Sequence, residues 1–448
     1  MAVIKIKRGQ DLRIAGRPLP VVAETPRPAR VALQPSDFRY LRPRLKVREG
    51  AAVRVGTPLF ESKDDPRVVF VSPASGRVAA VRLGERRRVL EVVVELSETE
   101  DFEPSPAMSA DDARGLERGE VVERLLAGGL WPLLRQRPFS RIADPDGEPK
   151  AVFIGAMSAE PFAPDPDALL EGREDEFQLG LDILGKLTAG EVHLCVAAEA
   201  KSAALTKARG VRIHRFAGPH PAGNVAVQIY HVDPPRGTDT VLYTGAQEVL
   251  AIARSFTTGR FSTERVVSFC GPGAKEPRYL RTRVGASIDS LARGGVQEGE
   301  LRFVSGGVLT GRQVEPSGFL GFYDTTLFVL REGRRRELLS FILPGFDKYS
   351  LSRALLSSWL PPGDHSVDTN LQGGVRHFLM NGVYEDVCPV DIIPDQLAKA
   401  VLADDVEEAE KHGILDCAEC GLCTFVCPSK IEIGSIIRRG LDEIVKEG

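Results

Sequence analysis

The sequence predicts a multidomain α/β protein that ends in a small, helical, cysteine-rich domain. Three features support this prediction. Short β-rich runs near the N-terminus are separated by glycine and proline, strand-like and helix-like segments alternate in the middle, and four cysteines lie close together near the C-terminus. The 448 residues are enough for about three or four domains. The net charge of −4 gives no electrostatic reason to expect a nucleic-acid partner. No apolar run reaches the length of a membrane span.

The first segment, predicted as a β domain over residues 1–110, has short alternating strands at 46–80 with glycine and proline turns between them. This spacing resembles a biotinyl/lipoyl-type β-hammerhead. In that family, a lysine on the central hairpin carries the swinging arm. Here the hairpin tip contains Lys63 without a flanking methionine. The resemblance therefore predicts a structural module in which Lys63 is an ordinary turn residue.

The second segment, residues 111–257, has strand-like runs at 151–156, 192–198, 211–216 and 240–246, with helical stretches between them. This alternation predicts a parallel, Rossmann-like sheet with helices on both faces. No G-x-G-x-x-G motif follows a strand, and no P-loop motif occurs. The glycine pair at 128–129 is followed by Trp131, Leu133 and Leu134. These bulky side chains would prevent a phosphate from approaching the backbone, so we expect a degenerate nucleotide fold.

The remaining chain divides into three parts. Residues 258–330 are rich in strands and glycine turns and predict a small β-grasp (SLBB-like) domain, and residues 331–375 form a connecting segment. Residues 376–448 have helical periodicity and predict a ferredoxin-like helical domain. Pro394 is expected near a helix start, and Ile433, Ile436 and Ile437 are expected on the apolar face of the last helix.

Five of the seven cysteines lie between residues 388 and 427, which favours a metal site over disulfides in a cytosolic chain. Cys195 and Cys270 lie in apolar runs and are predicted to be buried thiols. The other five comprise Cys388, before Pro389, and the run Cys417, Cys420, Cys423 and Cys427, before Pro428.

The spacing of that run is typical of [4Fe–4S] ferredoxins, and in two-cluster ferredoxins the fourth cysteine binds the other cluster. Upstream of Cys388, residues Met380, Val383 and Asp386 stand about where the cysteines of a second motif would be. The sequence thus predicts one surviving cluster and one erased cluster, with Cys427 spare. The predicted ligands are Cys388, Cys417, Cys420 and Cys423. A structural zinc site on the same thiolates and an unused relic remain the alternatives.

Seven segments, in order along nearly the whole chain, resemble the A subunit of the sodium-translocating NADH:quinone oxidoreductase (Nqr) family. They are VGTPLFESKDDPRVVFVSPASG (55–76), RQRPFSR (135–141), FAGPHPAGN (216–224), LRTRVGASIDSL (280–291), VSGGVLTG (304–311), ILPGFDKYSLSR (342–353) and LCTFVCPSK (422–430). That family is similar to the C subunit of the Rnf complex and to the flavin subunit of complex I. Those relatives have a glycine-rich flavin loop and an acidic pair that helps to hold NADH. This chain instead has AGGLWPLLRQRPF and Gly223-Asn224-Val225.

The resemblance therefore implies a peripheral subunit on the cytoplasmic side of the inner membrane, without FMN and without NADH oxidation of its own. It implies the other Nqr subunits as partners, especially a membrane-embedded neighbour, and ubiquinone as the substrate of the complex. The alternative functions are a purely structural scaffold and an electron-transfer subunit of the Rnf type. The segment PGFDKYSLSR, residues 344–353, is either a docking surface for a neighbouring subunit or plain structure.

The segment RQRPFSR is the candidate quinone site. It offers Arg135, Arg137 and Arg141 as hydrogen-bond donors to carbonyl oxygens, with Phe139 and Trp131 as apolar faces. The alternative is a solvated arginine-rich loop whose phenylalanine packs into the core. His220, in a turn between two prolines, is expected to be structural.

Overall fold

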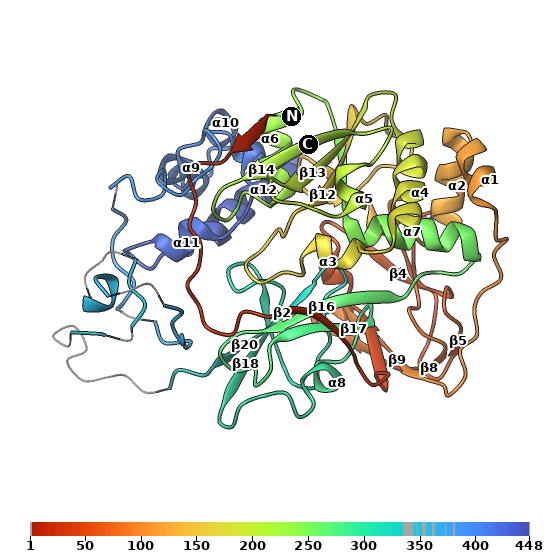
Figure 1. Cartoon of the computed structure of the whole chain (residues 1–448), viewed down its shortest axis with the longest axis horizontal. Helices are drawn as coiled ribbons and strands as arrows, with labels where there is room; N and C mark the ends of the chain where they lie inside the picture. The colour runs from red at the N-terminus through yellow and green to blue at the C-terminus, as the bar shows by residue number, and fades with distance from the viewer. Residues whose placement is uncertain are drawn as a thin grey trace.

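The computed structural model describes residues 2–334, 344–346, 348–351, 355–360, 363–371, 373–379 and 381–447. Within them, four β-sheets and a C-terminal group of helices follow the order that the sequence predicts (Figure 1). The predicted combination of a β domain, a parallel α/β domain, a second β domain and a helical domain is confirmed. The exact domain boundaries stay predictions. No helix of the described residues is long and apolar enough to cross a membrane.

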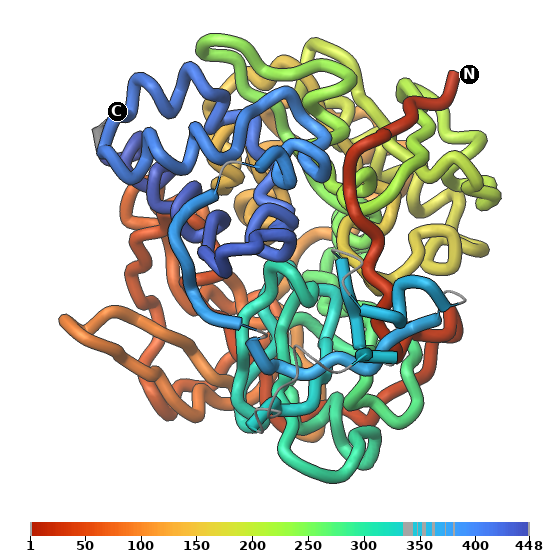
Figure 2. The backbone as a smooth tube through the Cα atoms, turned by 90° about the vertical axis from the view of Figure 1, so that its left-hand side faces the viewer, coloured from red at the N-terminus to blue at the C-terminus, as the bar shows by residue number. Residues whose placement is uncertain are grey.

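The N-terminal β domain consists of two small antiparallel sheets. One contains β3 (Arg30–Leu33), β9 (Val89–Leu96), β8 (Gly76–Leu83) and β5 (Ala52–Val53), and the other contains β4 (Pro43–Leu45), β6 (Pro58–Ser62) and β7 (Val69–Val71). The first two strands of the chain join other sheets: β1 (Val3–Lys5) pairs with β14 (Arg212–Ala217), and β2 (Leu19–Glu24) pairs with β17 (Arg278–Arg283). The N-terminal segment therefore ties two later domains together (Figure 2).

The α/β domain has a seven-stranded sheet in the order β1-β14-β13-β12-β15-β10-β11. Its central strands are β12 (Ala151–Ala156), β13 (Glu191–Ala197) and β15 (Val241–Gly245), and they run parallel to one another. They are almost entirely buried, as expected for parallel strands covered on both faces. Cys195 is fully buried in β13 and Cys270 in β16, which confirms the prediction for both thiols.

The arginine-rich segment forms the edge of this sheet. Residues Arg135–Arg137 form β10, which pairs antiparallel with β15, and Arg141–Ile142 form β11. The alternative that the segment is a solvated loop is therefore wrong: it is a hairpin whose first strand is hydrogen-bonded into the sheet. Residues Phe139 and Ser140 turn the chain with positive φ values of 74° and 52°.

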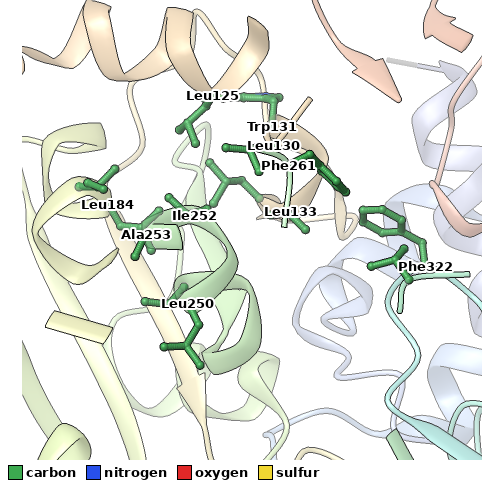
Figure 3. Close-up of a cluster of buried hydrophobic side chains, with 14 of the residues drawn as sticks. Leu125, Leu130, Trp131, Leu133, Leu184, Leu250, Ile252, Ala253, Phe261 and Phe322 are labelled. Atoms are coloured by element: carbon green, nitrogen blue, oxygen red, sulfur yellow. The ribbon is translucent and has the colours of Figure 1, made fainter. Parts of the chain in front are cut away.

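Seven helices surround the α/β sheet, and one continuous core joins it to the N-terminal β domain. They are α1 (Ala110–Gly115), α2 (Arg118–Ala127), α3 (Pro166–Leu170), α4 (Glu174–Leu184), α5 (Ala203–Thr206), α6 (Val225–Val232) and α7 (Ala246–Thr258). Figure 3 shows part of this core, including Leu125, Trp131, Leu133, Leu184 and Ile252. The indole N–H of Trp131 donates to the carbonyl of Ala143 at 2.8 Å, so this buried ring has its polar atom satisfied.

The second β domain is a six-stranded sheet in the order β19-β18-β20-β16-β17-β2, with one short helix, α8 (Ile288–Ala292). Its strands not yet given are β16 (Glu264–Cys270), β18 (Leu301–Ser305), β19 (Arg312–Val314) and β20 (Thr326–Arg331). The C-terminal helices are α9 (Pro394–Leu402), α10 (Val406–Lys411), α11 (Leu422–Val426) and α12 (Ile433–Glu447).

The C-terminal helices lie against the α/β domain (Figure 1). Helix α9 begins at Pro394, because proline lacks the N–H that is unsatisfied at that position in any case. Helix α12 buries Ile433, Ile437 and Leu441, which recur every fourth residue and so share one helical face. This helical domain brings Cys388 and the 417–423 segment into one apolar core.

Candidate functional site

A cavity of about 310 Å³ lies at the carboxyl ends of β12 and β15. Strand β13 lies on one side of β12 and β15 on the other. The order in which the chain adds strands to the sheet therefore reverses at this point. Ligands of open α/β sheets bind at such a switch point. The wall is completed by the start of α6, by the second β domain and by residues Ala418–Cys420 of the helical domain. We call it the switch-point cavity.

Arg135 lines this cavity between two aromatic rings. Its guanidinium carbon lies 4.7 Å from the ring centre of Tyr243 and 4.2 Å from that of Tyr323. The two rings stabilise its charge through cation–π interactions. Its Nε has no hydrogen-bond partner among the described residues, although it is shielded from solvent. Arg135 therefore offers an unsatisfied donor to whatever occupies the cavity.

Arg137 also lines the cavity, but its hydrogen bonds hold the cysteine segment. Its side chain donates to the carbonyls of Leu415, at 2.5 Å, and Cys417, at 3.0 Å. Only 5% of the residue is exposed. A buried arginine bonded to two backbone carbonyls is a structural clamp. Fewer of its N–H groups are therefore free to bind a ligand than the sequence suggests.

Two further contacts hold the same segment. Arg39, from the N-terminal β domain, makes a two-pronged ion pair with Glu419, and one of the two hydrogen bonds measures 2.8 Å. Asn224 caps α6 through the N–H of Ala226 and donates to the carbonyl of Ala418 at 3.2 Å. The 417–420 segment is thus fixed against both the α/β domain and the N-terminal domain.

The structure separates the four predicted quinone residues. Arg135 and Arg137 face the cavity together. Phe139 packs against the apolar core of the helical domain, and Arg141 is exposed on β11; neither lines the cavity.

Two carboxyl groups in the cavity have raised pKa values. Burial raises the pKa of Glu160 to about 7, and the negative charge of Asp324 adds to the rise. Burial also raises the pKa of Asp37 to about 6, against the lowering effect of Arg312, which contacts it at 3.1 Å. His220 lines the same cavity, and burial lowers the pKa of its imidazole.

A second, smaller cavity of about 30 Å³ lies inside the helical domain. Cys388, Cys417, Cys420 and Cys423 all line it, and Cys427 does not. Burial raises the pKa of Cys420 to about 11 and raises the pKa of the other three thiols above the ordinary value, with the neighbouring thiols adding to the rise for Cys417, Cys420 and Cys423. Cys427 lies elsewhere, with its sulfur 3.1 Å from the hydroxyl of Tyr384.

The thiol arrangement suits a four-iron cluster, and the zinc alternative makes a different demand on the distances between the sulfur atoms. A tetrahedral zinc site requires sulfur atoms about 2.3 Å from the metal, and hence about 3.8 Å from one another. Among the described residues, no three Cys, His, Asp or Glu side chains are grouped closely enough to bind a single metal ion. A cubane holds its four thiolates farther apart, because each binds a different iron atom. The four thiols line one enclosed space, as four ligands of one cluster must.

Sequence reasoning missed several residues of the cavity wall, notably Arg39, Glu160, Tyr243 and Tyr323. Glu160 could have been found, because it follows the predicted strand 151–156 by four residues, where switch-point ligands bind. Arg39 could not, because it comes from another domain. Three residues were predicted to stand where the cysteines of a second motif would be. Val383 and Asp386 do not line the thiol cavity, and Met380 lies outside the described residues.

Four family models match the chain in order. They are the NqrA N-terminal barrel-sandwich hybrid domain at residues 4–97, the NqrA second alpha/beta domain at 116–261, the NQRA C-terminal domain at 266–315 and a 4Fe-4S dicluster domain at 384–432. The last match adds independent support for a cluster-binding fold in the helical domain.

Full-length relatives share one name, which describes them as the A subunit of the Na(+)-translocating NADH-quinone reductase. The proteins of Serratia proteamaculans (strain 568) and Yersinia pseudotuberculosis serotype O:1b (strain IP 31758) are 41% and 39% identical, each over 100% of both chains. Among solved structures, a chain of the NAD+-reducing [NiFe]-hydrogenase in the air-oxidized state matches 76% of this chain and 64% of its own, with 12% identity and a TM-score of 0.40. The identity to the two full-length relatives, together with the NqrA domain matches, shows that the chain belongs to the NqrA family, the A subunits of Na(+)-translocating NADH-quinone reductases.

Proposed function

We propose that the chain is the peripheral A subunit of a sodium-pumping NADH:quinone oxidoreductase and that it binds ubiquinone in the switch-point cavity. In this proposal it lies on the cytoplasmic side of the inner membrane, with the other subunits as partners and a membrane-embedded one as its direct neighbour. The names of its full-length relatives support the assembly. The lining of the switch-point cavity supports ubiquinone as the ligand.

The observation that carries the quinone proposal is the unsatisfied Arg135. A quinone is a planar, largely apolar ring with carbonyl oxygens that accept hydrogen bonds. Met157, Val225 and Leu309 give the cavity apolar wall, and the Arg135 guanidinium gives it a donor fixed between two tyrosine rings. An apolar pocket with a few convergent donors is the usual form of such a site.

This proposal includes no FMN binding and no NADH oxidation by the chain itself. Gly129 has a φ of +64°, and a Cβ at that position would stand 2.3 Å from Cγ1 of Val71. Gly129 is therefore required for close packing against the N-terminal domain, which accounts for this glycine without a phosphate. Asn224, at the position of the relatives' acidic pair, caps a helix and holds the carbonyl of Ala418.

Cys388, Cys417, Cys420 and Cys423 would hold the [4Fe–4S] cluster in this proposal. Such a cluster supplies one-electron transfer when it is bound. The protein orients the ligands through its backbone: the N–H of Glu419 lies 3.4 Å from the sulfur of Cys417, and Arg137 fixes the carbonyls of Leu415 and Cys417. Residues 418–420 line both cavities, so the two proposed sites have a common wall.

The test compares two arginines of the same hairpin. Arg135→Gln removes the cavity's charged donor, whereas Arg141→Gln removes an exposed arginine outside it. A hydrogen bond from a charged donor contributes about 1.5–3 kcal/mol. We therefore expect Arg135→Gln to weaken the binding of a short-chain ubiquinone, measured by quenching of intrinsic fluorescence, by about tenfold or more. Arg141→Gln should bind as the wild type does.

If the two variants bound quinone with equal affinity, this cavity would not be the quinone site. The scaffold function would then be the better explanation. The same purified protein is expected to contain no FMN and to reduce no dye with NADH. Stoichiometric flavin would instead favour the Rnf-type alternative.

A further inference from the structure

Glu160 lines the switch-point cavity and forms no close ion pair with a described side chain. Burial and the negative charge of Asp324 raise its pKa by more than the N–H of Gly307 and the positive charge of Arg135 lower it. Its carboxyl lies against the backbone of Gly307, where a Cβ would stand 2.2 Å from Oε2. Gly307 therefore leaves space for this carboxyl, and the carboxyl is held in the wall of the cavity.

The other acidic residues around this cavity are neutralised or satisfied. Glu419 is paired with Arg39, and Asp37 with Arg312. Asp324 accepts a hydrogen bond from the hydroxyl of Ser305 at 2.6 Å. Burial disfavours a negative charge on Glu160, and the charge of Asp324 adds to this effect, so the neutral carboxylic acid persists to a higher pH than in an ordinary glutamate.

We propose that Glu160 carries a proton in the ligand-free protein and donates it in a hydrogen bond to a carbonyl oxygen of the bound quinone. This inference rests on the proposed function, because it needs a carbonyl-bearing ring in the cavity. Glu160 is then a second donor beside Arg135, and binding is coupled to the protonation of one carboxyl group. A deprotonated Glu160 would present a negative charge to the carbonyl oxygen and weaken binding.

The direction of the pH dependence follows from the pKa of Glu160, which burial raises to about 7. Below that value the carboxyl is already protonated, and Glu160 contributes no further pH dependence. Above it, the ligand must bind together with a proton, so the affinity falls by about tenfold for each pH unit. The arginines of the wall do not titrate in this range. Burial lowers the pKa of His220, which moves its titration away from this range.

The experiment uses the full chain, purified anaerobically, with short-chain ubiquinone as the probe. Calorimetry in buffers of different ionisation enthalpy should detect the uptake of up to one proton per quinone at about pH 8, and almost none at about pH 6. Glu160→Gln should bind with the same affinity at both pH values and take up no proton, because the amide donates without titrating. Arg141→Gln, which changes an exposed side chain outside the cavity, should keep the wild-type pH dependence.

Quinone affinity that does not change with pH in the wild type would overturn the inference while leaving the proposed function intact. Retention of the pH dependence in Glu160→Gln would also overturn it. A separate infrared titration of the ligand-free protein tests the proton itself: a carboxylic acid band should disappear near pH 7 in the wild type and be missing from Glu160→Gln. Absence of that band from the wild type would contradict the inference even if no quinone binds.

Discussion

Individual residues show most directly what the sequence could reveal and what it could not. The spacing of Cys417, Cys420 and Cys423 predicted three converging thiols, and they line one cavity. The sequence also singled out Cys388, on the basis of the proline that follows it, and Cys388 lines the same cavity. The contact between Cys427 and Tyr384 could not be predicted, because the two residues are brought together by the packing of the helical domain.

Replacement of Cys388 and Cys427 separates the possible ligand sets. Cys388→Ser, prepared anaerobically, is expected to lose most of its iron and its visible charge-transfer absorption, because serine replaces a thiolate of the proposed cluster. Cys427→Ser is expected to keep both, because Cys427 lies outside the thiol cavity. Iron and sulfide analysis with the absorption spectrum provides the measurement.

Loss of iron from Cys427→Ser but not from Cys388→Ser would assign all four ligands to the 417–427 run. Iron-free wild-type protein with one equivalent of zinc would favour the structural zinc site. Wild-type protein without either metal would make the cysteine run a relic.

Secondary-structure elements show why a local pattern was insufficient for the arginine-rich segment. Three residues of β10 are too few to show alternation, and the strand is stabilised by β15, about a hundred residues away in the sequence. The sequence singled out the arginines but could not separate their tasks. Arg135 faces the cavity between two rings, whereas Arg137, two residues later on the same strand, clamps the cysteine segment.

The clamp leads to a prediction about stability and metal content. Arg137→Ala removes two hydrogen bonds from a buried guanidinium and leaves the carbonyls of Leu415 and Cys417 without that donor. We expect the free energy of unfolding to fall by about 1–3 kcal/mol and the iron to be lost faster on exposure to a chelator. Chemical denaturation and the rate of iron release measure these effects.

Arg141→Ala is the matched control on the neighbouring strand, and it should behave as the wild type because its side chain is exposed. The stability and the rate of iron release of Arg137→Lys should lie between those of Arg137→Ala and Arg141→Ala, since an ammonium cannot reproduce the planar fork of the guanidinium. Iron release from Arg137→Ala at the wild-type rate would show that the clamp is dispensable for the cluster.

At the scale of the whole molecule, the sequence predicted the order and type of the domains but not how the chain connects them. Alternation of strands and helices identified the parallel sheet, because its central strands are mostly apolar and lie between helical stretches. Strands β1 and β2 could not be assigned to distant sheets, because pairing partners some two hundred residues away leave no local pattern. The shared wall of the two cavities likewise depends on domain docking.

The described part of the segment 344–379 has several exposed apolar side chains. Phe346 is 58% exposed, Trp359 77% and Val375 72%. A folded chain seldom leaves a tryptophan and a phenylalanine this exposed unless another surface covers them. Of PGFDKYSLSR, residues 347, 352 and 353 lie outside the described residues. The exposure of Phe346 and of the apolar side chains that follow favours a docking surface over plain structure, and we expect the membrane-embedded neighbour to cover them.

Trp359→Ser is therefore expected to reduce co-purification of the other subunits with the affinity-tagged chain, while the melting temperature of the isolated chain stays within a few degrees of the wild type. The reason is that an exposed ring contributes little to the fold but much to an interface, where tryptophans often carry most of the binding energy. Leu83→Ser, which removes an apolar side chain that is 45% exposed on β8, serves as the control and should leave assembly unchanged. Wild-type recovery of the complex with Trp359→Ser would place the docking surface on another face. A large fall in melting temperature would show instead that the ring stabilises the isolated chain.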